Sequence, residues 1–140
     1  MADSGVAFTK LDPDTGERFQ RLRQELGVTS FGLNLMVLQP GQRSRVHRHE
    51  RQEEVYLVQE GELTLVLDDG ERTLGPGDAV RVAHDVRRQL VNRGDSRLVM
   101  IAIGGHGEHA GRDGQAWESW DEGGPGRPPQ EVPLPGDLAD

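Results

Sequence analysis

The chain of 140 residues has no cysteine, no long apolar run and no excess of positive charge. The lack of cysteine excludes both a disulfide framework and a catalytic thiol. No apolar run approaches the length of a membrane-spanning helix, and the first residues lack the basic and apolar regions of a secretory signal. We therefore expect a cytoplasmic protein that does not bind membranes.

Negative charge exceeds positive charge by 8, and most of this excess lies near the C-terminus. Residues 105–140 carry a net charge of −6, whereas residues 1–104 carry −2. An acidic chain without a basic stripe is a poor binder of nucleic acid. One basic cluster is present, and it is interpreted either as a solvated strand face or as a guide for an anionic substrate. It consists of Arg43, Arg45, Arg48 and Arg51.

Short segments of alternating apolar and polar residues, separated by turns, dominate the middle of the chain. Glycine (19) and proline (8) are plentiful, and Asp69-Gly70 is a strong hairpin signal. Eight or nine short strands at such spacing predict an all-β sandwich or barrel. The expected strands cover residues 31–37, 43–49, 54–58, 63–67, 72–74, 80–82, 89–91 and 98–103.

The two ends of the chain differ from this pattern. Residues 1–29 are predicted to form an arm with an edge strand within 17–26, although Leu22 and Leu26, closed by Gly27, also fit one face of a helix. Residues 105–140 are predicted to form an acidic extension rich in glycine and proline. Its anchors, Trp117 and Trp120, are expected to cover a barrel edge or a subunit interface.

Two histidines two residues apart, His47 and His49, precede Glu54 and are framed by Gly41 and Gly61. On a strand, residues i and i+2 share a face, so both imidazoles are expected to project the same way. Two imidazoles and a carboxylate can hold a divalent ion and leave coordination positions open for water and substrate. We call His47, His49 and Glu54 the triad, and it predicts a site for Mn, Fe, Ni or Zn.

The stretch from Gly41 to Gly61 resembles the first sequence motif of the cupin superfamily, and residues 70–92 occupy the place of the second motif. The resemblance covers about residues 30–104. It implies a small cupin-like double-stranded β-helix, also called a jelly-roll barrel, with a pocket inside. It also implies a homodimer.

In that family the residues matching the triad are metal ligands, and a histidine of the second motif is the fourth. When the motif is aligned on Asn92, this fourth position holds Arg88. His84 lies four residues earlier and is better interpreted as a turn residue.

Arginine keeps its proton in proteins and therefore cannot be a ligand. Its charge is expected to weaken the binding of a divalent cation by about tenfold or more. Three arrangements follow. Arg88 pairs with Glu54 as a bidentate fork, and no metal binds. Alternatively, the triad holds a metal while Arg88 points to the mouth and binds a carboxylate or phosphate. In the third arrangement, metal binds only together with an anion.

Strand alternation places further candidates for substrate binding on the pocket side, namely Arg45, Tyr56 and Asn92 in addition to Arg88. Two functions remain open, and no catalytic residue is assigned. One is a metal-dependent dioxygenase, isomerase or decarboxylase acting on a small anionic molecule. The other is a non-catalytic protein that binds or senses a small molecule, either with a metal or without one and with Arg88 paired to Glu54.

Overall fold

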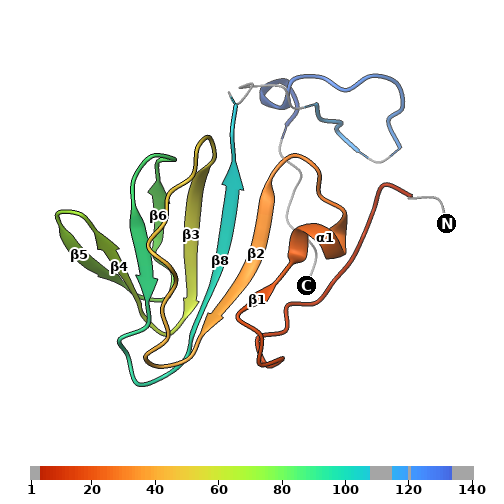
Figure 1. The fold of residues 1–140 in the computed structure, drawn as a ribbon. Coiled ribbons are helices and arrows are strands. Elements are labelled where there is room, and N and C mark those ends of the chain that lie inside the picture. Colours follow the sequence, from red (N-terminus) through yellow and green to blue (C-terminus); the bar gives the residue numbers. More distant parts are fainter. Residues whose placement is uncertain (1–3, 108–114, 120, 134–140) are drawn as a thin grey trace. The chain divides into compact units, whose positions relative to one another are not determined.

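The computed structural model describes residues 4–107, 115–119 and 121–133, which form two compact units divided between residues 106 and 107. Trp120, one of the two expected anchors, lies outside the described residues. The first unit contains all but one of the strands that the sequence predicts (Figure 1). Its elements are β1 (Phe19–Gln20), α1 (Leu22–Leu26), β2 (Gly32–Leu38), β3 (Glu53–Glu60), β4 (Leu63–Leu67), β5 (Gly70–Leu74), β6 (Ala79–Val82), β7 (Arg88–Val91) and β8 (Leu98–Gly105).

These strands form two antiparallel sheets. The larger sheet has the order β1-β2-β8-β3-β6, and the smaller has the order β5-β4-β7. The pairing of β2 with β8 and of β8 with β3 makes up most of the larger sheet. The prediction of an all-β jelly-roll fold is therefore confirmed.

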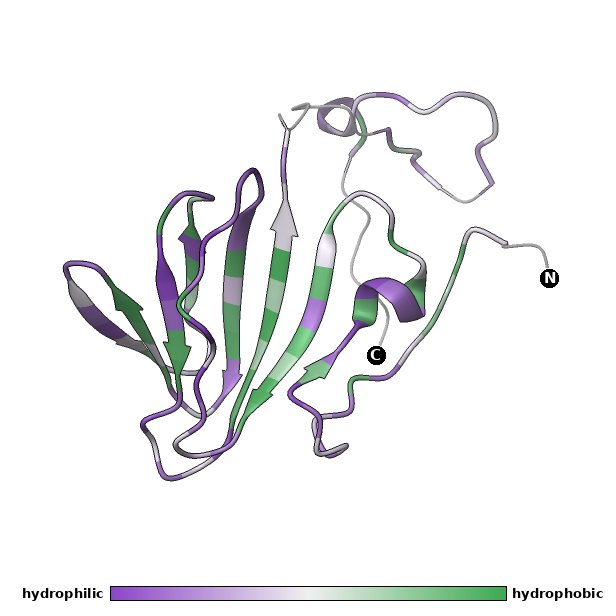
Figure 2. Cartoon of the chain, in the orientation of Figure 1, coloured by the Kyte–Doolittle hydropathy of each residue, from purple (hydrophilic) through white to green (hydrophobic). Residues whose placement is uncertain are grey.

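The main core lies between the sheets, on the inner face of the larger one. Along β2, Met36 and Leu38 point inward, whereas Leu35 and Val37 point to the outer face. Figure 2 shows the apolar residues concentrated on β2 and β8. Each large apolar side chain that is fully buried contributes about 1.5–3 kcal/mol to stability. The inner cluster also contains Tyr56, Val58, Leu63, Leu65, Leu74, Val82, Leu90, Leu98, Met100 and Ala102.

The edge strand predicted within residues 17–26 is correct only for Phe19 and Gln20, because the chain then turns into α1. Helix α1 has five residues and ends at Gly27, whose φ of 73° suits a left-handed cap. Leu22 is buried against the outer face of the larger sheet, which favours a helical turn over a continued strand. No helix within the described residues is long and apolar enough to cross a membrane.

The strand predicted over residues 43–49 is also corrected. This segment, which we call the histidine segment, runs beside β7 but forms only isolated bridges, at Arg43 and at His47. The amide of Leu90 donates to the side-chain hydroxyl of Ser44 at 2.9 Å. The hydroxyl thus replaces a backbone acceptor, and a regular ladder is interrupted there.

Gly61 makes the turn between β3 and β4. Its φ is +78°, and an added Cβ would lie 2.2 Å from the carbonyl oxygen of Arg97. A side chain at this position would therefore collide with backbone, which explains why this end of the first motif is a glycine.

The second unit is a short hairpin-like segment. Ala116 and Arg127 form a backbone bridge, with hydrogen bonds of 2.8 and 3.0 Å. The indole of Trp117 donates to the carbonyl of Gly124 at 2.9 Å, and a single 3-10 turn covers Pro129–Glu131. Trp117 therefore anchors its own unit.

Candidate metal and ligand site

The triad is assembled from the two sides of the barrel. His47 and His49 belong to the histidine segment, which is bonded to the β7 side, whereas Glu54 lies on β3 of the larger sheet. His47 pairs with Arg88 across the β7 bridge, so both side chains project to the same face. The amide of His49 donates to the carbonyl of His84 at 2.8 Å. Backbone pairing therefore aims both imidazoles at β3.

The donor atoms of the triad converge. One ligand atom from each residue lies within 4.8 Å of the others. Oε1 of Glu54 is 3.1 Å from Nε2 of His49 and 3.8 Å from Nε2 of His47. The two imidazole rings are 5.5 Å apart and nearly perpendicular. The histidine side chains are about 30% exposed and that of Glu54 is 15% exposed, so a ligand can reach the group from one side.

The remote nitrogen of each imidazole also has a partner. Nδ1 of His47 lies 2.8 Å from the carbonyl oxygen of Arg45, so this nitrogen carries the proton and Nε2 keeps its lone pair for a metal. Nδ1 of His49 lies 3.4 Å from the amide nitrogen of Gln52. With Gln52 in this orientation, Nε2 of His49 donates its proton to Glu54.

Arg88 pairs with Glu54 from the buried side of the site. Its side chain is fully buried, and Nη2 lies 2.5 Å from Oε1 of Glu54. Nη1 donates to the carbonyl of Val86 at 2.9 Å, and Nε donates to the hydroxyl of Tyr56 at 3.2 Å. Arg88 thus points at Glu54 and not at the mouth. The contact uses one carboxylate oxygen, so it is not the expected bidentate fork.

All of these donors meet on the same oxygen. The hydroxyl of Tyr56 donates to Oε1 of Glu54 at 2.7 Å, beside the bonds from Arg88 and His49. Within the described part of the chain, the second oxygen, Oε2, accepts no hydrogen bond. Because a carboxylate has about four lone-pair sites on two oxygens, Oε2 is available to an added cation.

This network sets the protonation of its members. Burial raises the pKa of Glu54, but hydrogen bonds from Tyr56 and Arg88 and electrostatic attraction from His49 and Arg88 outweigh it, so this pKa lies below its usual value. Burial and the charge of Glu54 raise the pKa of Tyr56 far above its usual value. At neutral pH, Glu54 is therefore a carboxylate and Tyr56 a neutral phenol.

A pocket of about 440 Å³ opens beside His47, between the histidine segment and the β1–β2 edge. The exposed Arg45 brings a positive charge to it, and Met36 and Leu38 give it an apolar wall. It is lined by Arg18, Phe19, Met36, Leu38, Ser44, Arg45 and His47. A small molecule with an anionic group is therefore the kind of ligand that the pocket suits.

Asn92, the remaining predicted contact, is buried under a turn. Its amide nitrogen donates to the carbonyls of Leu38 and Ser96, and its side-chain oxygen accepts from the amide of Gly94. These hydrogen bonds engage the side-chain amide of Asn92 in stabilising the turn. A contact between Asn92 and a substrate stays a prediction. His84 is exposed in the turn before β7, as its interpretation as a turn residue requires.

Gln52 is a site residue that the sequence reasoning missed. Besides its contact with His49, its side chain occupies the space that a side chain at residue 104 would fill, because a Cβ added to Gly104 would lie 2.5 Å from Oε1 of Gln52. Strand alternation contains a signal for it, since Gln52 is two residues before Glu54 and alternation extended to it would place both on the same face.

The donor set fits a divalent metal ion. His47 already presents a lone pair at Nε2, and Oε2 of Glu54 is free of hydrogen bonds from described residues. His49 can present Nε2 once Gln52 turns its carboxamide so that its oxygen accepts from Nδ1. Arg88 is the one feature opposed to this, because it places a positive charge next to the carboxylate.

Comparisons with known proteins agree with this architecture. The sequence profile of the cupin domain family matches residues 34–104. Protein SchB of Streptomyces halstedii is 36% identical over 75 residues, which cover 52% of this chain and 54% of that relative. A cupin from Silicibacter pomeroyi described as a sugar phosphate isomerase is 38% identical with a TM-score of 0.59, covering 64% of this chain and 59% of that one.

A cupin protein from Bacteroides fragilis superposes with a TM-score of 0.71 over 82% of this chain and 99% of that one. Its identity is 22%, so it bears on the fold alone. The match spans little more than half the length of SchB and of the isomerase.

Proposed function

This chain belongs to the cupin domain family, and we propose that its triad binds a divalent metal ion beside a pocket for a small anionic molecule. The observation that carries the proposal is the convergence of three ligand atoms within 4.8 Å, one of whose residues, His47, also lines the pocket that contains Arg45. A bound metal would supply Lewis-acid chemistry to an oxygen of the ligand.

The residues of the chain have separate tasks in this proposal. His47, His49 and Glu54 hold the metal, and Arg45 attracts the anionic group of the ligand. Arg88 and Tyr56 keep Glu54 ionised and fix its orientation through Oε1. Tyr56 does not act as a base, because its pKa is raised and its proton is donated to Glu54.

Among the reaction classes open to such a site, isomerisation of a small phosphorylated sugar is the first to test. This choice is supported by the relative from Silicibacter pomeroyi, which is described as a sugar phosphate isomerase. Dioxygenation and decarboxylation of a small acid are the next classes, and the same metal site would serve them.

A second candidate is a non-catalytic, metal-free binding protein. The observation that favours it is the pairing of Arg88 with Glu54, because the guanidinium already supplies a positive charge to the carboxylate. In this case the pocket would bind its anionic ligand and release it unchanged.

The metal separates the two candidates. Protein purified without a histidine tag is loaded with Mn, Fe, Ni or Zn, dialysed, and analysed by elemental mass spectrometry. We expect close to one ion per chain for the native sequence and strong loss for His47→Ala. His84→Ala is the matched control, since this exposed histidine lies outside the triad. Failure of every metal to remain bound would leave the binding protein as the function.

A further inference from the structure

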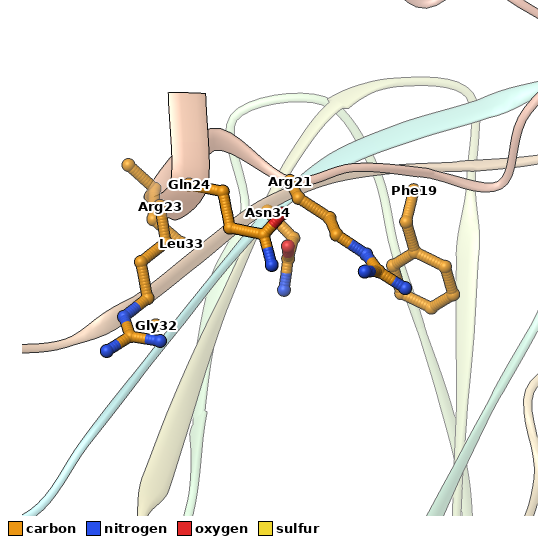
Figure 3. Close-up of a pocket in the computed structure, with 7 residues that line it drawn as sticks. All are labelled: Phe19, Arg21, Arg23, Gln24, Gly32, Leu33 and Asn34. Carbon is orange, nitrogen blue, oxygen red and sulfur yellow. The ribbon is translucent and has the colours of Figure 1, made fainter. Parts of the chain in front are cut away.

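A second pocket, of about 400 Å³, lies at the free edge of β2 (Figure 3). We call it the edge notch. It arises because β1 pairs only with Leu35 and Met36, after which the chain turns into α1. Residues 32–34 of β2 therefore have no strand neighbour on this side, and the turn into α1 brings Arg21 and Gln24 beside them.

The edge notch is positively charged. Arg21 and Arg23 line it, and none of its lining residues is acidic. Among the residues the structure describes, neither guanidinium forms an ion pair or a hydrogen bond. The carboxylate next along the chain, Glu25, accepts hydrogen bonds at Oε1 from Thr9 at 2.6 Å and from Gln20 at 3.2 Å, and within the described chain it forms no ion pair with either arginine. The two charges are therefore available to an anion.

Neutral donors lie between the two arginines. Gln24 and Asn34 both line the notch, and in the view of Figure 3 their carboxamides lie near its middle, with the side chains of Arg21 and Arg23 to either side. Neither carboxamide has a hydrogen-bond partner within the described chain. Four side chains with unused N–H groups thus surround one pocket.

The backbone adds a further donor. The amide of Val37 donates to the carbonyl of Arg18, the residue just before β1, at 2.8 Å. Amides two and four residues along a strand point the same way, so the amide of Leu33 also faces this edge. Since β1 ends at Gln20, the amide of Leu33 meets the notch and not a strand.

We propose that the edge notch binds the phosphate group of a small phosphate monoester. Two guanidinium groups without a facing carboxylate favour a doubly charged anion, and guanidinium geometry matches phosphate oxygens. The ring of Phe19, which is 50% exposed, lines the same pocket and gives the organic part of the ligand an apolar surface.

The notch and the triad belong to the same sheet. Gly32 pairs with Gly104, which pairs in turn with Glu54, so one strand, β8, lies between β2 and β3, and this pairing places Gly32 about 10 Å from Glu54. Asn34 projects from the inner face, as Glu54 does, whereas Leu33 packs on the outer face. The phosphate site needs no metal, so its test is independent of the function proposed above.

The test uses inorganic phosphate and the full chain. Two-dimensional ¹H–¹⁵N NMR follows the carboxamides of Gln24 and Asn34 during a phosphate titration, with sodium chloride at matched ionic strength as reference. We expect saturable shifts at these carboxamides. Arg21→Ala and Arg23→Ala should each weaken the fitted affinity by about tenfold.

Arg72→Ala is the matched control, because Arg72 is exposed on β5 and forms no ion pair within the described chain. It should leave the affinity unchanged. Equal weakening by all three substitutions would mean general screening of charge and would overturn the proposal, as would shifts confined to the residues around His47. Because Arg21 and Arg23 are exposed, the two variants should have the same melting temperature as the native protein. A chain that binds phosphate but no metal would keep this inference while losing the proposed metal site.

Discussion

Nη2 of Arg88 lies 2.5 Å from Oε1 of Glu54, so a fully buried guanidinium of β7 is joined to a largely buried carboxylate of β3. The resemblance to the second cupin motif aligns Arg88 with a histidine ligand of that family. In this structure Arg88 instead donates a hydrogen bond to Glu54, one of the proposed ligands. The stability of the barrel and the metal affinity of the triad are therefore connected through this pair.

Removing the guanidinium should destabilise the fold. Arg88→Met leaves Glu54 in a largely buried position without its cation, and we expect the free energy of unfolding to fall by about 3 kcal/mol. Urea denaturation measures the change. Arg81→Ala breaks an exposed pair with Glu53, 3.7 Å apart on neighbouring strands, and should cost less than about 1 kcal/mol. Similar losses for both variants would contradict this view of Arg88.

Replacing Arg88 by histidine should strengthen metal binding. Arg88→His removes the repulsion and adds an imidazole opposite His47, so we expect zinc to bind about tenfold more tightly or better. Isothermal titration calorimetry on folded protein measures the affinity. Arg88→Met separates the two effects, because it removes the charge without adding a ligand. An unchanged affinity in both variants would show that Arg88 does not oppose the metal.

The ionisation of Glu54 should make stability depend on pH. Its pKa is held below the usual 4.5, so the unfolded chain takes up this proton at a higher pH than the folded chain does. The stabilisation is present above about pH 4.5 and is lost as the pH falls through the lower, folded-state pKa. Urea denaturation across this range should show a steeper acid loss for the native chain than for Glu54→Gln. Glu53→Gln, at a half-exposed carboxylate, should behave like the native chain.

Adding a methyl group at residue 104 should disturb His49. A Cβ at Gly104 would lie 2.5 Å from Oε1 of Gln52, whereas a Cβ at Gly32 would meet nothing closer than 3.7 Å. We expect Gly104→Ala to displace Gln52 and weaken zinc binding several-fold, with Gly32→Ala close to native. Calorimetry again supplies the affinities. Combining Gly104→Ala with Gln52→Ala should remove the collision. If the double variant is still less stable than Gln52→Ala alone, the destabilisation by Gly104→Ala does not come from contact with Gln52.

Much of the fold follows from local pattern. Alternation in β4 and β8 and the turn at Gly70 predict strands that the structure contains, because each has one face in the main core. The choice of His47, His49 and Glu54 follows from residue type and spacing, and their ligand atoms do converge, although the two histidines lie on a segment with isolated bridges and not on a regular strand.

Other features depend on tertiary contacts that no local pattern contains. The ladder beside β7 is interrupted by the hydroxyl of Ser44, and the turn into α1 is favoured by burial of Leu22 on a sheet formed by distant residues. The sequence does not determine the direction of Arg88, because a long side chain reaches either the mouth or the carboxylate from the same backbone position. Its hydrogen-bond partners on β3 and in the turn before β7 direct the side chain to the carboxylate.

The triad also spans the two sheets, because its histidines come from the β7 side of the barrel and its carboxylate from the opposite sheet. Separating the sheets would destroy the ligand site, so any ion or molecule that bridges them must be released before the barrel opens. A ligand present at 100 times its dissociation constant would then raise the free energy of unfolding by about 2.7 kcal/mol. The melting temperature of the whole barrel thus reports whether the triad is occupied. Candidate ligands can be ranked by how far they raise this temperature before any reaction is known.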